Sequence, residues 1–237
     1  MRTTLYRADT RGHANHGWLN SYHSFSFASY YDPKRMGFGV LRVLNDDEVS
    51  AGMGFNTHGH SNMEIISIPL EGDLEHKDDM GNTTVIRNGD IQVMSAGTGV
   101  KHSEYNHSKD TKVKFLQIWV VPKKLNVEPR YDQITLNEDD LKNQLFQIVS
   151  PNEDDNGVWI HQDAWFHLGS FDTVMDLDYK LKNSSNGVYA FLLEGSCSVD
   201  GEKLAKRDAI SIEKTEVLNF KMDMGSKLLL MEVPLAN

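Results

Sequence analysis

The sequence predicts an all-β protein made of two β-domains in tandem, each a sandwich or a barrel, joined by a short connecting helix. Two observations lead to this fold class: short β-prone runs are separated by glycine-containing turns, and such runs recur on both sides of a polar stretch rich in proline. The 237 residues suffice for one large domain or two small ones, each able to bury a core. A hydrophobic content of 39% excludes an intrinsically disordered chain.

The first half contains five β-prone runs bounded by turn signals such as Asn88-Gly89-Asp90. Short strands with turns at this spacing are typical of a sandwich or a barrel. The predicted strands are Met36 to Leu44, Glu64 to Leu70, Thr83 to Ile86, Ile91 to Met94 and Val113 to Val121.

The stretch from Pro122 to Gly157 has the composition of a joint, with three prolines and two acidic clusters. Within it, residues 135–145 are the most helix-like segment of the chain. Thr135 and Glu138 have the spacing of a capping box, and Leu141 and Leu145 would share one helical face. We therefore expect a short connecting helix here.

The second half repeats features of the first. Leu70-Glu71-Gly72 matches Leu193-Glu194-Gly195, and both Asp90 and Asp208 directly precede an apolar run. These matches indicate an internal duplication, with domains at residues 1–135 and 136–237. The predicted strands of this half are Val158 to Ile160, Val188 to Leu193, Ala209 to Ile212 and Leu228 to Val233.

Composition excludes several classes of function. The formal charge of −10 argues against direct binding to nucleic acid or to anionic lipid. No apolar run approaches the roughly 20 residues of a membrane helix, and Met1 to Thr10 do not resemble a signal peptide. Cys197 is the only cysteine, so no internal disulfide or cysteine-based metal site can form. These features predict a cytoplasmic protein.

The histidines carry the clearest chemical signal. His58 and His60 would share one face of a strand, and Glu64 follows at the same parity. His102 and Glu104 form a second alternating pair. Two neighbouring strands would then direct three imidazoles and a carboxylate into one interior, a donor set that suits a divalent metal. Placement of the histidines on polar loops is the alternative.

The spacing of glycines around these two pairs resembles the two sequence motifs of the cupin superfamily, whose fold is a small jelly-roll-like β-barrel with a metal inside. Longer segments resemble the pirin family, especially its bacterial members, over most of residues 1–135. These segments are His58-Gly59-His60, Leu70-Glu71-Gly72, Glu75-His76-Lys77-Asp78, Met80-Gly81-Asn82, residues 95–104, residues 11–18 and residues 23–27.

The resemblance implies a bicupin with one metal site, in the N-terminal barrel alone. The metal ligands of the family fall on His58, His60, His102 and Glu104. Glu64 would then lie in the barrel wall or beside the ligands. One divalent ion is expected, with Fe(II) as the first choice and Ni, Cu, Mn, Co or Zn as alternatives, because this donor set serves several metals. No organic cofactor is expected.

The second half is expected to lack a metal site. Alignment of the two Leu-Glu-Gly segments places Leu181, Asn183 and Gly187 opposite His58, His60 and Glu64. Counting from Asp208 as from Asp90 places Phe220 opposite His102.

The remaining histidines receive structural interpretations. His76, among charged neighbours, is expected on a solvated face, and His167 at a surface. His13, His16 and His23 are expected at a strand edge or between the domains.

The resemblance also implies a reaction: a metal-dependent quercetin 2,3-dioxygenase, which opens the heterocycle of a flavonol with O2. Glu104 would accept the proton of the substrate hydroxyl and is the predicted catalytic residue. The alternative is a non-catalytic, redox-sensing iron protein that regulates a protein partner. A cupin isomerase or decarboxylase that uses the metal only as a Lewis acid is a third hypothesis.

Overall fold

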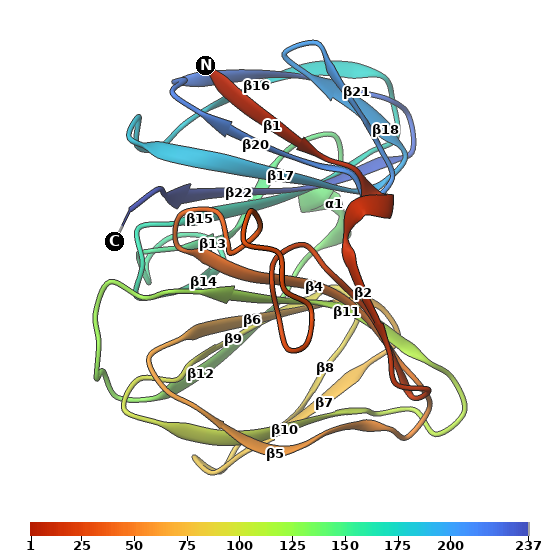
Figure 1. The fold of residues 1–237 in the computed structure, drawn as a ribbon, viewed down its shortest axis with the longest axis vertical. Helices are drawn as coiled ribbons and strands as arrows, with labels where there is room; N and C mark the ends of the chain where they lie inside the picture. Colours follow the sequence, from red (N-terminus) through yellow and green to blue (C-terminus); the bar gives the residue numbers. More distant parts are fainter. Residues whose placement is uncertain (237) are drawn as a thin grey trace.

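The computed structural model describes residues 1–236 and consists of four β-sheets stacked in layers (Figure 1). Two seven-stranded inner sheets face each other in the middle, and a four-stranded outer sheet closes each of them into a barrel. In hydrogen-bonded order, the outer N-terminal sheet is β5 (Gly54–His60), β10 (Val100–Asn106), β7 (Leu74–Asp78) and β8 (Thr83–Ile86). The inner N-terminal sheet is β12 (Arg130–Thr135), β9 (Asp90–Ser95), β6 (Glu64–Glu71), β11 (Val113–Val120), β4 (Leu41–Val49), β3 (Leu19–His23) and β2 (Gly12–Asn15).

The C-terminal barrel repeats this arrangement. Its inner sheet is β1 (Arg2–Tyr6), β20 (Ala209–Glu213), β17 (Asn186–Glu194), β22 (Ser226–Pro234), β15 (Trp165–Phe171), β13 (Phe146–Ser150) and β14 (Val158–Trp159). Its outer sheet is β16 (Met175–Lys180), β21 (Val217–Met222), β18 (Ser196–Val199) and β19 (Glu202–Ala205). The strand order β5-β10-β7-β8 thus recurs as β16-β21-β18-β19, in agreement with the duplication that the sequence indicates.

The inner strands are buried on both faces, and the two faces differ in polarity. In β11, Leu116 and Ile118 belong to an apolar cluster that also contains Phe166 of β15 and so joins the two inner sheets. The alternate residues Gln117 and Trp119 face the interior of the N-terminal barrel, where Gln117 binds Glu104. Side chains alternate along a strand, so one element serves the packing of the whole molecule and the lining of the barrel.

Each barrel contains a strand that precedes the other barrel in the chain. β1, at the start of the chain, pairs with β20 of the second barrel, whereas β12, which leads into the second half, pairs with β9 of the first. Each of these two strands is tied by an aspartate. Asp90 accepts hydrogen bonds from Thr135 Oγ1 (2.6 Å) and Gln133 Nε2 (2.8 Å). Asp208 accepts hydrogen bonds from Arg7 Nη1 (2.6 Å) and from the backbone N–H that follows Arg7 (2.8 Å).

Two sequence predictions were wrong in detail. The first predicted strand begins at Leu41 rather than Met36, because the preceding residues form a loop. The connecting helix is a single turn, α1 (Glu138–Leu141), and its N-cap is Asn137, whose side chain accepts a hydrogen bond from the Asp139 N–H. Thr135 cannot cap it, because Thr135 is the last residue of β12.

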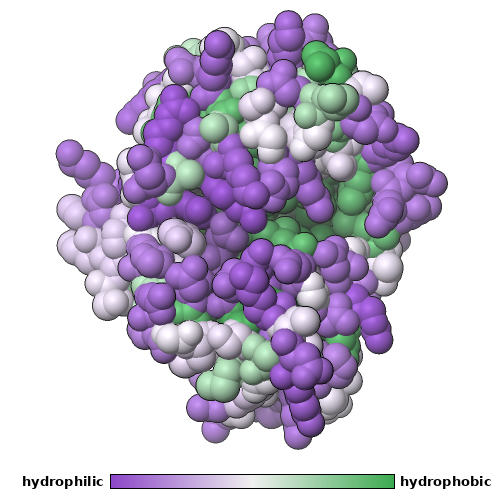
Figure 2. Space-filling view, turned by 90° about the vertical axis from the view of Figure 1, so that its right-hand side faces the viewer, coloured by the Kyte–Doolittle hydropathy of each residue, from purple (hydrophilic) through white to green (hydrophobic). Residues whose placement is uncertain are grey.

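The face shown in Figure 2 is largely hydrophilic, with apolar residues visible mainly in a recess at mid-height. Among residues 1–236 no helix is long and apolar enough to cross a membrane.

Candidate metal centre

Three histidines meet inside the N-terminal barrel. His58 and His60 lie on β5, and His102 is the direct cross-strand partner of His58 on the neighbouring β10. Each offers a ring nitrogen within 4.8 Å of the others. The ring centroids of His58 and His102 are 4.5 Å apart, and those of His60 and His102 are 5.0 Å apart. We call these residues the histidine triad.

The triad has the chemical state that a divalent metal requires. His102 Nε2 is buried and has no hydrogen-bond partner, although buried polar atoms are nearly always satisfied. His58 Nδ1 lies 2.8 Å from the backbone oxygen of Asn56, which fixes the ring and leaves Nε2 available. Burial, reinforced by the neighbouring imidazoles, lowers the pKa of His60 to about 4 and that of His102 to about 2. Neutral rings can donate lone pairs to a metal, so these residues fit the ion that the sequence predicts.

Glu104 lies two residues beyond His102 on the same strand and is also buried. Its carboxylate accepts hydrogen bonds from Ser67 Oγ (3.1 Å) and Gln117 Nε2 (2.7 Å). Burial raises its pKa to about 7 despite these hydrogen bonds, which act in the opposite direction. The carboxylate is not part of the triad's close nitrogen cluster. It belongs to a second group, with His76 and His102.

His76 is the residue that sequence reasoning missed. It is fully buried on β7, and its Nδ1 lies 3.5 Å from His102 Nδ1. Its Nε2 lies 3.0 Å from Asp78 Oδ2, and Asp78 also accepts three hydrogen bonds from Met80 and Asn82. The prediction of a solvated face was wrong. The alternation of Leu74, His76 and Asp78, all buried, was the available signal.

The alternation pattern predicts that Glu64 shares a face with the histidine triad, and this prediction was wrong. On β6, Ser67 points to Glu104 inside the barrel, whereas Glu64 points to the opposite side and accepts a hydrogen bond from Ser95 Oγ (2.7 Å). Three residues between β5 and β6 move the chain to another sheet, so parity is not carried across them. Glu64 is therefore part of the barrel wall.

Polar residues cross the inner sheet opposite the triad in one continuous row. Each member is the direct cross-strand partner of the next, from β3 through β4, β11 and β6 to β9. All are buried, which is unusual for polar side chains on a barrel interior. We call them the polar row: His23, Asn45, Gln117, Ser67 and Gln92.

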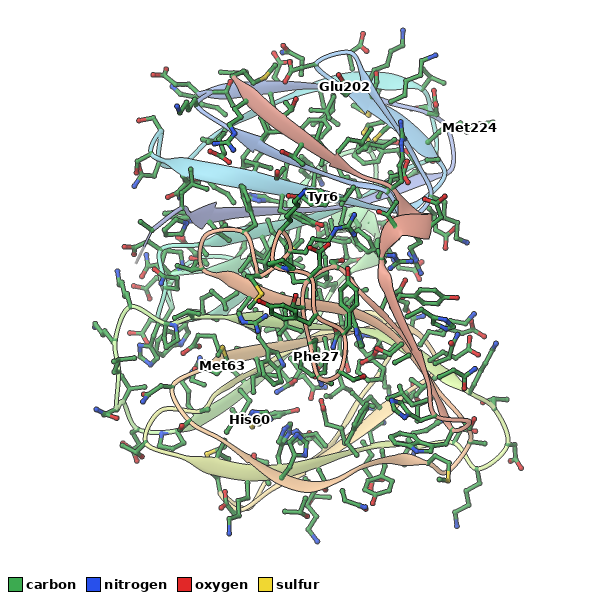
Figure 3. The ribbon with its side chains drawn as sticks, viewed as in Figure 1. Tyr6, Phe27, His60, Met63, Glu202 and Met224 are labelled. Atoms are coloured by element: carbon green, nitrogen blue, oxygen red, sulfur yellow. The ribbon has the colours of Figure 1, made fainter. Side chains whose placement is uncertain are left out.

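A cavity of about 500 Å³ opens beside the triad and is lined by His58, His60 and Glu104. Its wall is aromatic: the ring of Trp119 meets His60 edge-on at 5.0 Å and Phe27 at 5.4 Å. Figure 3 shows His60 inside the lower barrel, with Phe27 nearer to the waist of the molecule. The cavity gives a flat apolar molecule access to the triad.

Among residues 1–236, the second barrel contains no comparable group. Leu181 and Phe220 pack in its apolar core, and both groups of side chains that could hold a metal ion lie in the first barrel. Two further predictions on histidines were wrong: His167 is buried in the second barrel beside Tyr179, and His23 lines the cavity of the first.

Two family models match the chain. One, described as Pirin, matches residues 5–120, and the other, described as the quercetinase C-terminal cupin domain, matches residues 147–233.

Several proteins are similar over nearly the whole chain. A quercetin 2,3-dioxygenase of Escherichia coli K12 is 40% identical over 97% of this chain and 98% of its own length. A pirin-like protein of Caulobacter vibrioides is 36% identical over 94% of this chain and 96% of its own. The crystal structure of E. coli YhhW in complex with nickel(II), a bacterial pirin, superimposes with a TM-score of 0.93 at 37% identity, covering 98% of this chain and 99% of the other.

Proposed function

The chain belongs to the pirin family of two-domain cupin proteins, and from this premise we propose that it is a metal-dependent dioxygenase that opens the heterocycle of flavonols such as quercetin with O2. Proteins named quercetin 2,3-dioxygenase are similar over its full length, which supports an oxidoreductase of this class. We also propose residues 1–135 and 136–237 as its two domains. β1 lies in the first of these segments but pairs with β20 of the second barrel, whereas β12 ends the first segment and pairs with β9 of the first barrel.

One observation carries the proposal: three imidazoles, two of them kept neutral by burial, and a buried carboxylate lie at an aromatic-walled cavity. We propose His58, His60, His102 and Glu104 as the metal ligands. Fe(II) is our first choice of metal, and nickel is the ion in the similar E. coli protein. A bound divalent ion would supply Lewis acidity that stabilises the oxyanion of a flavonol.

The side chains of this protein prepare the substrate for that chemistry. Glu104 has a pKa raised to about 7, so near neutral pH it can take the proton of a substrate hydroxyl. Ser67 and Gln117 hold the carboxylate in place by donating to its two oxygens. The edges and faces of Trp119 and Phe27 give a planar ring a surface to pack on, and their bulk keeps water from that side of the cavity.

The test combines metal analysis with turnover. We expect one metal ion per chain in freshly purified protein, and loss of quercetin absorbance together with O2 uptake. His58→Ala should abolish both the bound metal and turnover. Glu104→Gln removes the proton acceptor and should lower kcat by about 10²- to 10⁴-fold. His107→Ala is the matched control, because His107 is an exposed histidine paired with Glu75 outside the cavity.

Bound metal without O2 uptake in the presence of flavonols would overturn the proposal. Conversion of quercetin under strictly anaerobic conditions would instead indicate Lewis-acid chemistry, as in a cupin isomerase or decarboxylase.

A further inference from the structure

The cavity beside the histidine triad has a second polar end, formed by His23 of β3 with Asn45 and Asp47 of β4. We propose that this end, the distal subsite, hydrogen-bonds a hydroxyl group on a part of the substrate remote from the part that reaches the triad. For the class of substrate, the inference rests on the proposed function. It adds a specificity determinant that lies outside the metal ligands.

The first argument is unsatisfied polarity. His23 and Asn45 are only 3% and 2% exposed, yet His23 Nδ1 and Asn45 Oδ1 have no hydrogen-bond partner. A buried polar group without a partner destabilises the folded protein. Two members of the polar row avoid this destabilisation, because Ser67 and Gln117 both bind Glu104. Gln92 also has side-chain atoms without a partner, but it does not line the cavity. The unsatisfied atoms of His23 and Asn45 belong to residues that line the cavity, where a ligand can reach the side chains.

The second argument is the charge of the subsite. Burial lowers the pKa of His23, so its ring is neutral and offers one donor and one acceptor. The amide of Asn45 also offers both. Asp47 accepts a hydrogen bond from Ser21 Oγ, and burial raises its pKa to about 7. A neutral hydroxyl, which both donates and accepts, fits this set, whereas a phosphate or carboxylate would find no cationic partner among these three residues.

The third argument is the path between the two ends of the cavity. Trp119 contacts His60 of the triad, Phe27 contacts Trp119, and the ring of His23 contacts Phe27 at 5.4 Å. Each of these contacts is edge-on, which is a favourable aromatic geometry. The wall is therefore continuous from the triad to the distal subsite, and a planar molecule of several rings can lie along it. The substrate class that matches both ends is a planar aromatic with hydroxyl groups at separate positions.

The test compares the equilibrium binding of two flavonols to the nickel-loaded protein under anaerobic conditions. Quenching of tryptophan fluorescence measures the binding. Quercetin carries hydroxyl groups on its outer rings, whereas 3-hydroxyflavone keeps only the 3-hydroxyl that would reach the metal. We expect the wild-type protein to bind quercetin about tenfold more tightly, as one or two additional hydrogen bonds would give. Asn45→Leu and His23→Phe should each bring this preference close to one.

Asn20→Leu is the matched control, because Asn20 lies on the same strand as His23 but binds His13 at the surface and should leave the preference intact. Bound nickel and the unfolding temperature identify any variant that fails to fold, and the second variant then decides. Absence of a preference in the wild type, or an unchanged preference in both variants, would overturn the distal subsite. Failure of the proposed function looks different: the preference and its loss would persist, but no O2 would be consumed.

Discussion

His102 joins two networks through its two ring nitrogens. Nε2 is left free in the histidine triad, while Nδ1 faces His76, which in turn binds Asp78. Such outer partners fix the orientation of a ligand ring and tune its basicity. His76 and Asp78 are therefore positioning residues for the proposed metal site rather than members of it.

We predict that His76→Phe and Asp78→Asn each weaken metal binding by about 10- to 100-fold, because the ring of His102 loses its fixed orientation. Competition with a chromophoric chelator measures the effect directly, without reference to turnover. Glu75→Gln is the control on the same strand, since Glu75 pairs with exposed His107. If His76→Phe and Asp78→Asn bound the metal as tightly as Glu75→Gln does, the ring of His102 would not depend on His76 and Asp78 for its orientation.

At this scale the sequence predicts that His58 and His60 share one face of a strand and that His102 and Glu104 share one face of another, because alternation within one strand is a reliable geometric rule. It does not predict His76, whose immediate neighbours Glu75 and Lys77 point outward and give the segment a solvated appearance. Nor does it predict the orientation of Glu64, since the rule ends wherever the chain leaves a strand.

Among the elements, the inner strands show why the N-terminal barrel is polar inside and the second barrel is not. β11 presents Gln117 to the N-terminal barrel, whereas β22, its counterpart in the second inner sheet, presents Leu228 and Leu230 to an apolar core. The strands themselves follow from the apolar runs, and β8 has the predicted bounds Thr83–Ile86. The start of β4 was less predictable because the apolar residues before Leu41 pack from a loop.

His167 on β15 gives the second barrel a measurable pH dependence. Burial lowers the pKa of its ring to about 4, whereas the unfolded chain takes up the proton near pH 6.5. Its contribution to stability is therefore fully present above pH 6.5. About 3 kcal/mol of unfolding free energy is lost as the pH falls from 6.5 toward 4.

We predict that His167→Phe reduces the loss of unfolding free energy between pH 7 and pH 4, as measured by urea denaturation at several pH values. Phenylalanine keeps the edge-on contact with Tyr179 and carries no titratable nitrogen. His107→Phe, at an exposed position, should follow the wild-type curve. A His167→Phe curve parallel to the wild type would contradict this account.

On the scale of the whole molecule, each barrel depends on a strand that precedes the other barrel in the chain: β1 belongs to the second barrel and β12 to the first. The sequence reveals the duplication through the repeated Asp90 and Asp208. It does not reveal the place of β1, because strand pairing over about 200 residues leaves no local pattern. The structure explains why an aspartate recurs at both turns: each binds the incoming strand.

We predict that Asp208→Ala lowers the unfolding free energy by about 3 kcal/mol, because it leaves the donors of Arg7, Ala8 and Ala205 without their acceptor. Metal content should stay unchanged, since the first barrel does not include β1. Chemical denaturation beside metal analysis measures both effects. Exposed Asp110 provides the control substitution, and an equal stability of the two variants would show that Asp208 does not anchor the strand.

The place of the first strand in the second barrel also sets an order of events on the ribosome. Arg7 and Asp208 are 201 residues apart, so at typical synthesis rates the first strand waits roughly 10–40 s before its partner is made. All strands of the N-terminal barrel have been synthesised once Thr135 has been added. The earliest part of the nascent chain is thus among the last to find its place, and an ion could be captured before the second half exists.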